Sequence, residues 1–122
     1  MFKVFKNFEG NDIASTIYGE QSDPLVIFLH GGGQTRFAWD SAAENISKKG
    51  FFVITYDLRG HGKSPVTNKD FNLDDLVSDL EKVREKTKIE KGHFFGHSLG
   101  GMISPAYARK YPGRVLSVGM LS

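Results

Sequence analysis

The stretch "GHFFGHSLGG", which runs from Gly92 to Gly101, places one serine, Ser98, between two glycines. A short apolar run comes before this serine, and a segment with helical spacing follows it. A serine on a sharp turn from a strand to a helix sits on a strained backbone, so the residues two before and two after it must be small. Gly96 and Gly100 meet that demand. The pattern G-x-S-x-G in this context is typical of a nucleophile elbow, which presents a serine hydroxyl at the end of a sheet.

The same pentapeptide has a second interpretation, a glycine-rich turn in which Ser98 merely caps the following helix. Short motifs recur by chance, so the pentapeptide alone does not separate the two. In the catalytic interpretation, the N-terminus of the helix stabilises negative charge, and the backbone N–H of Leu99 is placed to donate to an oxyanion. The decision therefore rests on other segments of the chain.

A second glycine-rich segment, residues 29–34 with the sequence LHGGGQ, follows a continuous apolar run at residues 25–29. Glycines let backbone N–H groups approach a ligand closely, which suits the second half of an oxyanion hole. A dinucleotide-binding loop is excluded, because the pattern G-x-G-x-x-G counted from Gly31 ends on Arg36.

A third segment, residues 56–64 with the sequence YDLRGHGKS, contains a GKS triplet that is typical of phosphate-binding loops. Such a loop requires a glycine five residues before Gly62, where this chain has Asp57. It also requires a helix directly after the triplet, where this chain has Pro65. The nucleotide-binding interpretation fails, and we expect Asp57 to organise the turn instead.

Alternating strand-like and helix-like segments indicate the fold class. Apolar or alternating runs predict strands at residues 2–8, 13–18, 25–29, 51–56, 93–95 and 115–121. Helical spacing predicts one helix that includes Trp39, a second that is capped by Asn72 with Asp75 in its first turn, and a third at residues 99–110. This order favours an α/β fold with a mostly parallel sheet and helices on both faces, in one domain of 122 residues.

The composition excludes several classes of function. The net charge is +2 with interspersed charges, so we expect neither nucleic acid nor a membrane as a partner. The absence of cysteine excludes disulfides, a thiolate nucleophile and cysteine-ligated metal. The first ten residues lack the apolar core of a signal peptide, and no stretch reaches transmembrane length. A cytoplasmic location is the default expectation.

In this order, the three segments resemble the α/β-hydrolase superfamily, whose members carry HGGG or similar, then D-x-R-G-x-G-x-S, then GHSxGG. Here they read HGGG at residues 30–33, DLRGHGKS at 57–64 and GHSLGG at 96–101. The resemblance implies the first six strands of the hydrolase core. It also implies a serine hydrolase, esterase-like, with a small ester-type substrate and no cofactor or metal.

The resemblance also assigns residues. It implies that Ser98 is the nucleophile and that Leu99 and Gly32 supply the donors of the oxyanion hole. Further candidates for the oxyanion or substrate loop are His30, Gly31 and Gly33.

The acid and the histidine of a catalytic triad are missing from the chain. The family places its triad in the order serine, acid, histidine, but the 24 residues after Ser98 contain no histidine, aspartate or glutamate. We therefore expect residues 1–122 to be the N-terminal portion of one core domain, without lid, triad acid and triad histidine, and inactive alone. Two alternatives remain, a non-catalytic binding module on the hydrolase scaffold and one half of a split enzyme.

None of the histidines upstream of the serine is expected to act as its base. His30 belongs to the glycine loop and His97 directly precedes the nucleophile, so both are interpreted as structural. His93 lies within a predicted strand. His61 lies at the correct edge of the sheet, but the family's strand order separates its strand from that of Ser98, beyond hydrogen-bond reach.

Two expectations concern the end of the chain. Pro105 lies inside the helix predicted at residues 99–110, where a proline removes a hydrogen bond and introduces a kink. The strand at residues 115–121 would become an apolar sheet edge with unpaired backbone groups. We therefore expect self-association, or binding to a complementary C-terminal half.

Overall fold

The computed structural model of the chain describes residues 1–65 and 70–121. Its strands are β1 (Phe2–Lys6), β2 (Asp12–Tyr18), β3 (Leu25–Leu29), β4 (Phe52–Tyr56), β5 (Gly92–His97) and β6 (Val115–Leu121). Its helices are α1 (Asp40–Ser47), α2 (Leu73–Thr87) and α3 (Leu99–Lys110), with short 3-10 turns η1 (Arg36–Trp39) and η2 (Pro112–Arg114).

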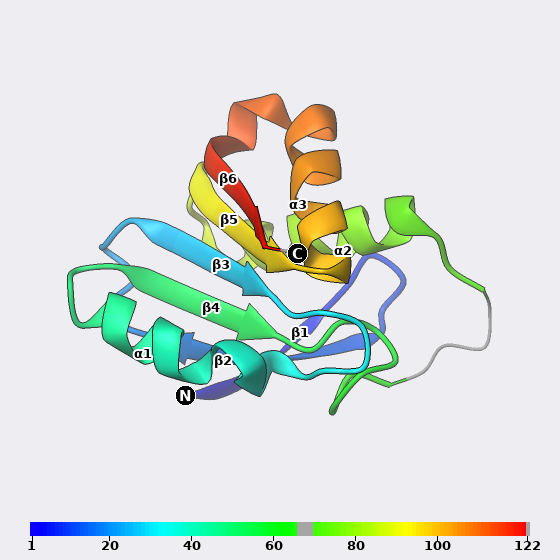
Figure 1. Cartoon of the computed structure of the whole chain (residues 1–122), viewed down its shortest axis with the longest axis horizontal. Coiled ribbons are helices and arrows are strands. Elements are labelled where there is room, and N and C mark those ends of the chain that lie inside the picture. Colours follow the sequence, from blue (N-terminus) through cyan, green and yellow to red (C-terminus); the bar gives the residue numbers. More distant parts are fainter. Residues whose placement is uncertain (66–69, 122) are drawn as a thin grey trace.

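The described strands form one sheet in the order β1-β2-β4-β3-β5-β6 (Figure 1). The pairs β1–β2 and β2–β4 are antiparallel, whereas β4, β3, β5 and β6 run parallel to one another. The predicted class, a mostly parallel sheet in an α/β fold, is therefore confirmed. The order also separates β4 from β5 by β3, as the resemblance implied.

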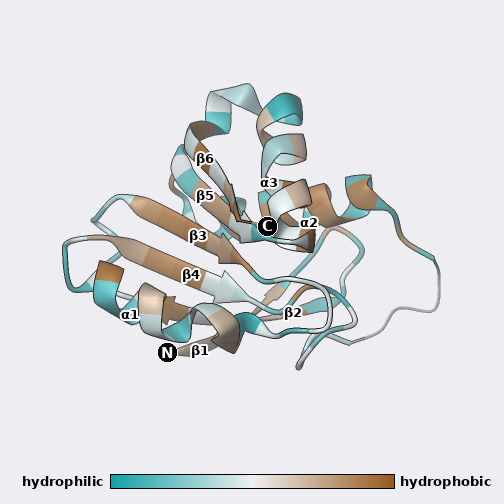
Figure 2. Cartoon of the chain, viewed as in Figure 1, coloured by the Kyte–Doolittle hydropathy of each residue, from teal (hydrophilic) through white to brown (hydrophobic). Residues whose placement is uncertain are grey.

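The central strand β3 is apolar on both faces because helices cover both faces of the sheet. Side chains alternate along a strand, so Val26 and Phe28 face α1, while Ile27 and Leu29 face α2 and α3. All five residues of β3 are buried, and Figure 2 shows the strand as hydrophobic along its length.

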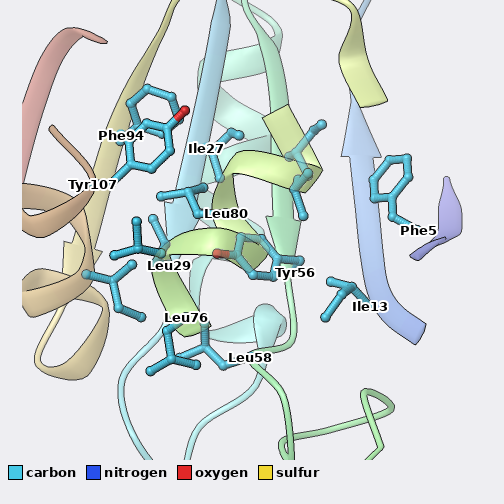
Figure 3. Packing of buried hydrophobic residues seen from close by; sticks show 14 of the residues in the cluster. Phe5, Ile13, Ile27, Leu29, Tyr56, Leu58, Leu76, Leu80, Phe94 and Tyr107 are labelled. Carbon is cyan, nitrogen blue, oxygen red and sulfur yellow. The ribbon is translucent and has the colours of Figure 1, made fainter. Parts of the chain in front are cut away.

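The larger hydrophobic core lies between the sheet and the helices α2 and α3. Figure 3 shows Leu76 and Leu80 from α2 beside Ile27 and Leu29 of the sheet. Tyr107 of α3 packs against Phe94 of β5, with ring centroids 4.7 Å apart and ring planes tilted by 51°. This packing fixes α3 against the carboxyl ends of β3 and β5, where the predicted nucleophile lies.

Two helix predictions have clear outcomes. Asn72 and Asp75 form a reciprocal capping box at the start of α2, which confirms the predicted cap. Helix α3 has the predicted bounds and runs as one element through Pro105. The kink expected at Pro105 stays a prediction.

Strand β6 lies at the edge of the sheet, because its described partner is β5 alone. Its uncovered side chains are apolar, and Met120 is 66% exposed. The other exposed apolar residues of β6 are Leu116, Val118 and Leu121. An apolar edge of this kind is a template for pairing with another strand.

Candidate active site

Ser98 lies at the junction of β5 and α3 in a backbone conformation that serine rarely adopts. Its φ of 54° and ψ of −112° fall in a sparsely populated region. Ser98 is exposed, and its side chain caps no N–H of the described helix. The interpretation of Ser98 as a mere helix cap is therefore wrong, and the strained turn presents its hydroxyl to solvent.

The elbow glycines are required by close backbone contacts. A Cβ atom on Gly96 would lie 2.0 Å from the carbonyl oxygen of Gly100. A Cβ atom on Gly100 would lie 2.4 Å from the carbonyl oxygen of Leu29 in β3. Both distances are far below van der Waals contact, so the G-x-S-x-G pattern has the steric cause that the sequence predicted.

The end of β6 supports the elbow from the other side. The backbone N–H of Ser98 donates to the carbonyl of Leu121 at 2.9 Å. A groove of about 460 Å³ opens beside the serine. It is lined by Ser98, Gly101, Met102, Met120 and Leu121. The groove is therefore apolar apart from the serine itself.

The glycine loop after β3 lies against the elbow. A Cβ atom on Gly31 would lie 3.2 Å from the Cβ of Ser98. The N–H of Gly31 donates to Oε1 of Gln34 at 2.8 Å, whereas no hydrogen bond within the described residues engages the N–H of Gly32 or Gly33. Leu99 is the first residue of α3, so its N–H has no intrahelical acceptor. The glycine loop thus contacts the elbow through Gly31, and the assignment of Gly32 and Leu99 as oxyanion donors stays a prediction.

His30 holds the start of this loop from within the core. Its Nε2 accepts a hydrogen bond from the N–H of Leu58 at 3.0 Å, and its Nδ1 lies 2.7 Å from the carbonyl oxygen of Gly31. Burial lowers the pKa of His30, which favours the neutral ring that this pattern needs. Both nitrogens are occupied and the ring is fully buried, so His30 supports the loop and does not face a substrate.

A buried ion pair holds the other end of the loop. The carboxylate of Asp57 accepts hydrogen bonds from the backbone N–H of Arg36 at 2.7 Å and from its guanidinium. It also accepts one from the N–H of Lys63 at 3.0 Å. Gly62 must lack a side chain, because a Cβ there would lie 2.4 Å from Cγ of Asp57. Asp57 therefore organises the turn, as predicted.

Residues 24–122 match the sequence model of the alpha/beta hydrolase fold family. The chain belongs to the α/β-hydrolase family. This match agrees with the three motifs in order and with the sheet that positions them.

Relatives of this α/β-hydrolase include several kinds of hydrolase. The chain is 31% identical over 104 residues to the bifunctional esterase/perhydrolase DCH of Acinetobacter calcoaceticus, covering 85% of this chain and 38% of that protein. It is 32% identical over 99 residues to 3-oxoadipate enol-lactonase 1 of Acinetobacter baylyi, covering 81% and 36%. It is 30% identical over 102 residues to human epoxide hydrolase 4, covering 82% and 28%.

Solved structures show the same fold. Epoxide hydrolase A from Mycobacterium thermoresistibile superposes with a TM-score of 0.95 at 27% identity, over 100% of this chain and 39% of that one. A carboxylesterase structure from Nitrososphaera gargenis gives a TM-score of 0.86 at 31% identity, over 95% and 44%. The chain thus spans less than half the length of these relatives.

Within the described residues of this α/β-hydrolase, no hydrogen bond reaches the hydroxyl of Ser98, and two upstream histidines bond to other groups. His61 packs against His30 with ring centroids 5.1 Å apart, and its Nδ1 lies 3.2 Å from the carbonyl of Arg59. His93 bonds instead to Oγ of Ser117 at 2.6 Å. These placements agree with the structural roles expected for the upstream histidines.

The supporting roles of Gln34 and Arg36 were missed by the sequence interpretation. Each holds the loop through a contact that only the fold creates. One signal was present: three glycines, which have no side chains to fix their own conformation, are followed directly by Gln34 and, after Thr35, by Arg36.

Within residues 1–65 and 70–121, no group of three or more histidine, aspartate or glutamate side chains could hold a metal ion. Within the same ranges, no helix is both long enough and apolar enough to cross a membrane.

Proposed function

We propose that this chain carries the nucleophile and the oxyanion hole of a serine hydrolase that acts on the ester-type carbonyl of a small molecule. The oxygen of Ser98 attacks the carbonyl carbon, and its proton passes to a base. The N–H groups of Leu99 and Gly32 then stabilise the negative oxygen of the tetrahedral intermediate. The observation that carries the proposal is the strained, exposed Ser98 with the glycine loop in contact with it through Gly31.

The identity of the nucleophile favours esters and lactones over epoxides. Attack of a serine oxygen on a carbonyl carbon gives an acyl-enzyme, whose carbonyl water can attack in a second step. Attack of the same oxygen on an epoxide carbon would leave an ether, which has no carbonyl for water to attack. Ser98 would then be modified without turnover. Among the relatives, the esterase and the enol-lactonase therefore indicate the reaction class better than the epoxide hydrolases do.

The catalytic base and acid are proposed to lie on polypeptide outside residues 1–122, in the same chain or in a second one. A serine without its base is a weak nucleophile, so residues 1–122 alone would catalyse little. The open edge of β6 supports this proposal. So does an apolar cavity of about 390 Å³ beside that edge, which is lined by Phe28, Trp39, Ile46, Phe95, Gly119, Met120 and Leu121. A complementary segment that adds to β6 would cover both.

A fluorophosphonate probe tests the nucleophile directly. Residues 1–122 are incubated with an aryl fluorophosphonate, and the modified peptide is identified by mass spectrometry. Labelling is expected to be slow without a base but selective for Ser98, and Ser98→Ala should abolish it. Labelling spread evenly over other serines, or equal labelling of the alanine variant, would contradict the proposal and favour a non-catalytic binding module.

A further inference from the structure

Between the ends held by His30 and Arg36, the glycine loop is bonded to the side chain of Gln34. Its Oε1 accepts a hydrogen bond from the N–H of Gly31 at 2.8 Å. Its own backbone N–H donates to the carbonyl of Gly31 at 3.1 Å. Both the N–H and the carbonyl of Gly31 thus bond to Gln34, and the same carbonyl also lies 2.7 Å from Nδ1 of His30.

The bonds of Gln34 use the N–H of Gly31 and leave the N–H of Gly32 without an acceptor in the described residues. Gly31 is the loop residue in contact with the elbow, because a Cβ on it would lie 3.2 Å from the Cβ of Ser98. Its N–H is consumed by Gln34, whereas the next N–H, that of Gly32, has no acceptor within the described residues. Three consecutive glycines have wide conformational freedom, so the turn needs an external restraint to keep one arrangement.

Gln34 lies at the site itself. It lines a cavity of about 170 Å³ with Ala38, Trp39, His97 and Leu121. His97 directly precedes Ser98, and Leu121 accepts the backbone hydrogen bond of Ser98. Gln34 is exposed, so its side chain is not part of the hydrophobic core.

We propose that Gln34 is a positioning residue of the oxyanion hole, whose side-chain carbonyl holds Gly31 so that the N–H of Gly32 stays directed at the reacting oxygen. The oxyanion part of this inference rests on the proposed function. The hold of Gln34 on Gly31 does not, and it can be measured without turnover.

Amide hydrogen exchange in ¹⁵N-labelled residues 1–122 tests the hold. Gln34→Met removes the acceptor and keeps the length of the side chain, so the Gly31 N–H should exchange about five- to tenfold faster. Gln34→Glu keeps an acceptor oxygen and should preserve the slow exchange. Both variants should keep the unfolding temperature of the unchanged chain. Unchanged Gly31 exchange in Gln34→Met, or equal acceleration in both variants, overturns the proposal.

The labelling rate of Ser98 by the aryl fluorophosphonate is the second readout. Gln34→Met should slow this rate by about tenfold, because the oxyanion donor loses its fixed direction. Gln21→Met is the matched control, since Gln21 is exposed and bonds to the carbonyl of Thr87. It should leave the rate unchanged. If Ser98 of the unchanged chain is not labelled at all, the proposed function is overturned together with the oxyanion role. If Gln34→Met and the unchanged chain are labelled at equal rates, only the role of Gln34 is overturned.

Discussion

The carboxylate of Asp57 accepts hydrogen bonds from both the backbone N–H and the guanidinium of Arg36, which precedes it by 21 residues. The next residue, Leu58, donates its N–H to His30. Two consecutive residues after β4 therefore hold both ends of the glycine loop. The DLRGHGKS segment thus acts on the glycine loop through contacts of Asp57 and Leu58.

Asp57→Asn should destabilise the fold strongly. It removes the negative charge beside the buried Arg36, and breaking a buried pair in this way costs about 3–5 kcal/mol. Urea unfolding monitored by circular dichroism measures the loss. Asp12→Asn is the matched control, because the Lys6–Asp12 pair is 63% and 46% exposed, and such pairs contribute under about 1 kcal/mol. Equal losses in the two variants would contradict the assignment of Asp57.

Gly32→Pro should slow the reaction of Ser98 with the fluorophosphonate by about 10²–10³-fold, because it removes one oxyanion donor. Gly32→Ala keeps the N–H, and its Cβ would meet no described atom within 4 Å. The alanine variant should therefore react at nearly the unchanged rate. Circular dichroism confirms that both variants are folded. A folded proline variant with an unchanged rate would move the second donor elsewhere, with Gly33 as the next candidate.

Gly31→Ala should impair the site although the change is one methyl group. The new Cβ would lie 3.2 Å from the Cβ of Ser98 and 3.0 Å from Oε1 of Gln34, so these neighbours must move by a few tenths of an ångström. We expect labelling of Ser98 to slow several-fold, because the rate depends on how the serine is placed relative to the loop. The comparison with Gly32→Ala, one residue away, separates this steric effect from a general effect of alanine in the loop.

Residues 1–122 alone should show no turnover of p-nitrophenyl acetate that depends on Ser98. Lysine and histidine side chains give a slow background, and this background should persist in Ser98→Ala. A steady release of p-nitrophenol that disappears in Ser98→Ala would show that a histidine within the chain completes the site, and His61→Gln would then identify or exclude the leading candidate.

Acidification should weaken the fold through His30. Burial lowers the pKa of His30 below its ordinary value of 6.5, so the unfolded chain takes up the proton first. The stability contributed by neutral His30 is complete above pH 6.5 and falls as the pH drops toward the folded-state pKa. The limiting slope for one proton is about 1.4 kcal/mol per pH unit. Urea unfolding at pH 7.5 and 5.5 measures this loss, and His30→Gln should reduce it. An equal loss in that variant would assign the pH dependence to other groups.

The edge of β6 should drive association at micromolar concentration. Sedimentation velocity is expected to show species larger than a monomer, and Val118→Lys should shift the distribution toward monomer, because a charge opposes edge pairing. Val4→Lys places the same change on β1, at the opposite edge of the sheet, and serves as the control. A compact monomer in the unchanged chain would contradict the expectation.

Local patterns account for much of the fold. Strand β3 and helix α3 have their predicted bounds, because apolar runs and flanking turn residues lie close together in sequence. Strand β5 extends beyond the prediction at both ends, to Gly92 and His97. Glycine disfavours strands locally, but Gly92 and Gly96 lie where neighbouring groups approach too closely for a side chain. The strand order came from the family resemblance and not from any local pattern.

The candidate site also contains residues that the sequence predicted and residues that it did not. Ser98 and its glycines were identifiable because backbone strain demands small residues at fixed spacing. The bond between Gln34 and Gly31 and the pair of Arg36 with Asp57 were not, because side-chain rotamers and contacts 21 residues apart leave no periodic signal. The pair of Arg36 with Asp57 forms because the sheet places β3 and β4, which precede these two residues, side by side.

The contact of Gly96 with Gly100, and of Gly100 with Leu29, has a consequence for how this scaffold can diversify. Backbone touches backbone at these points, so β3, β5 and α3 behave as one rigid body, and no substitution at the two glycines is tolerated. Within the described residues, we therefore expect variation in substrate range at the exposed side chains around the groove, such as Met102 and Met120. Laboratory selection for a new acyl group should accumulate changes at those methionines and leave the elbow untouched.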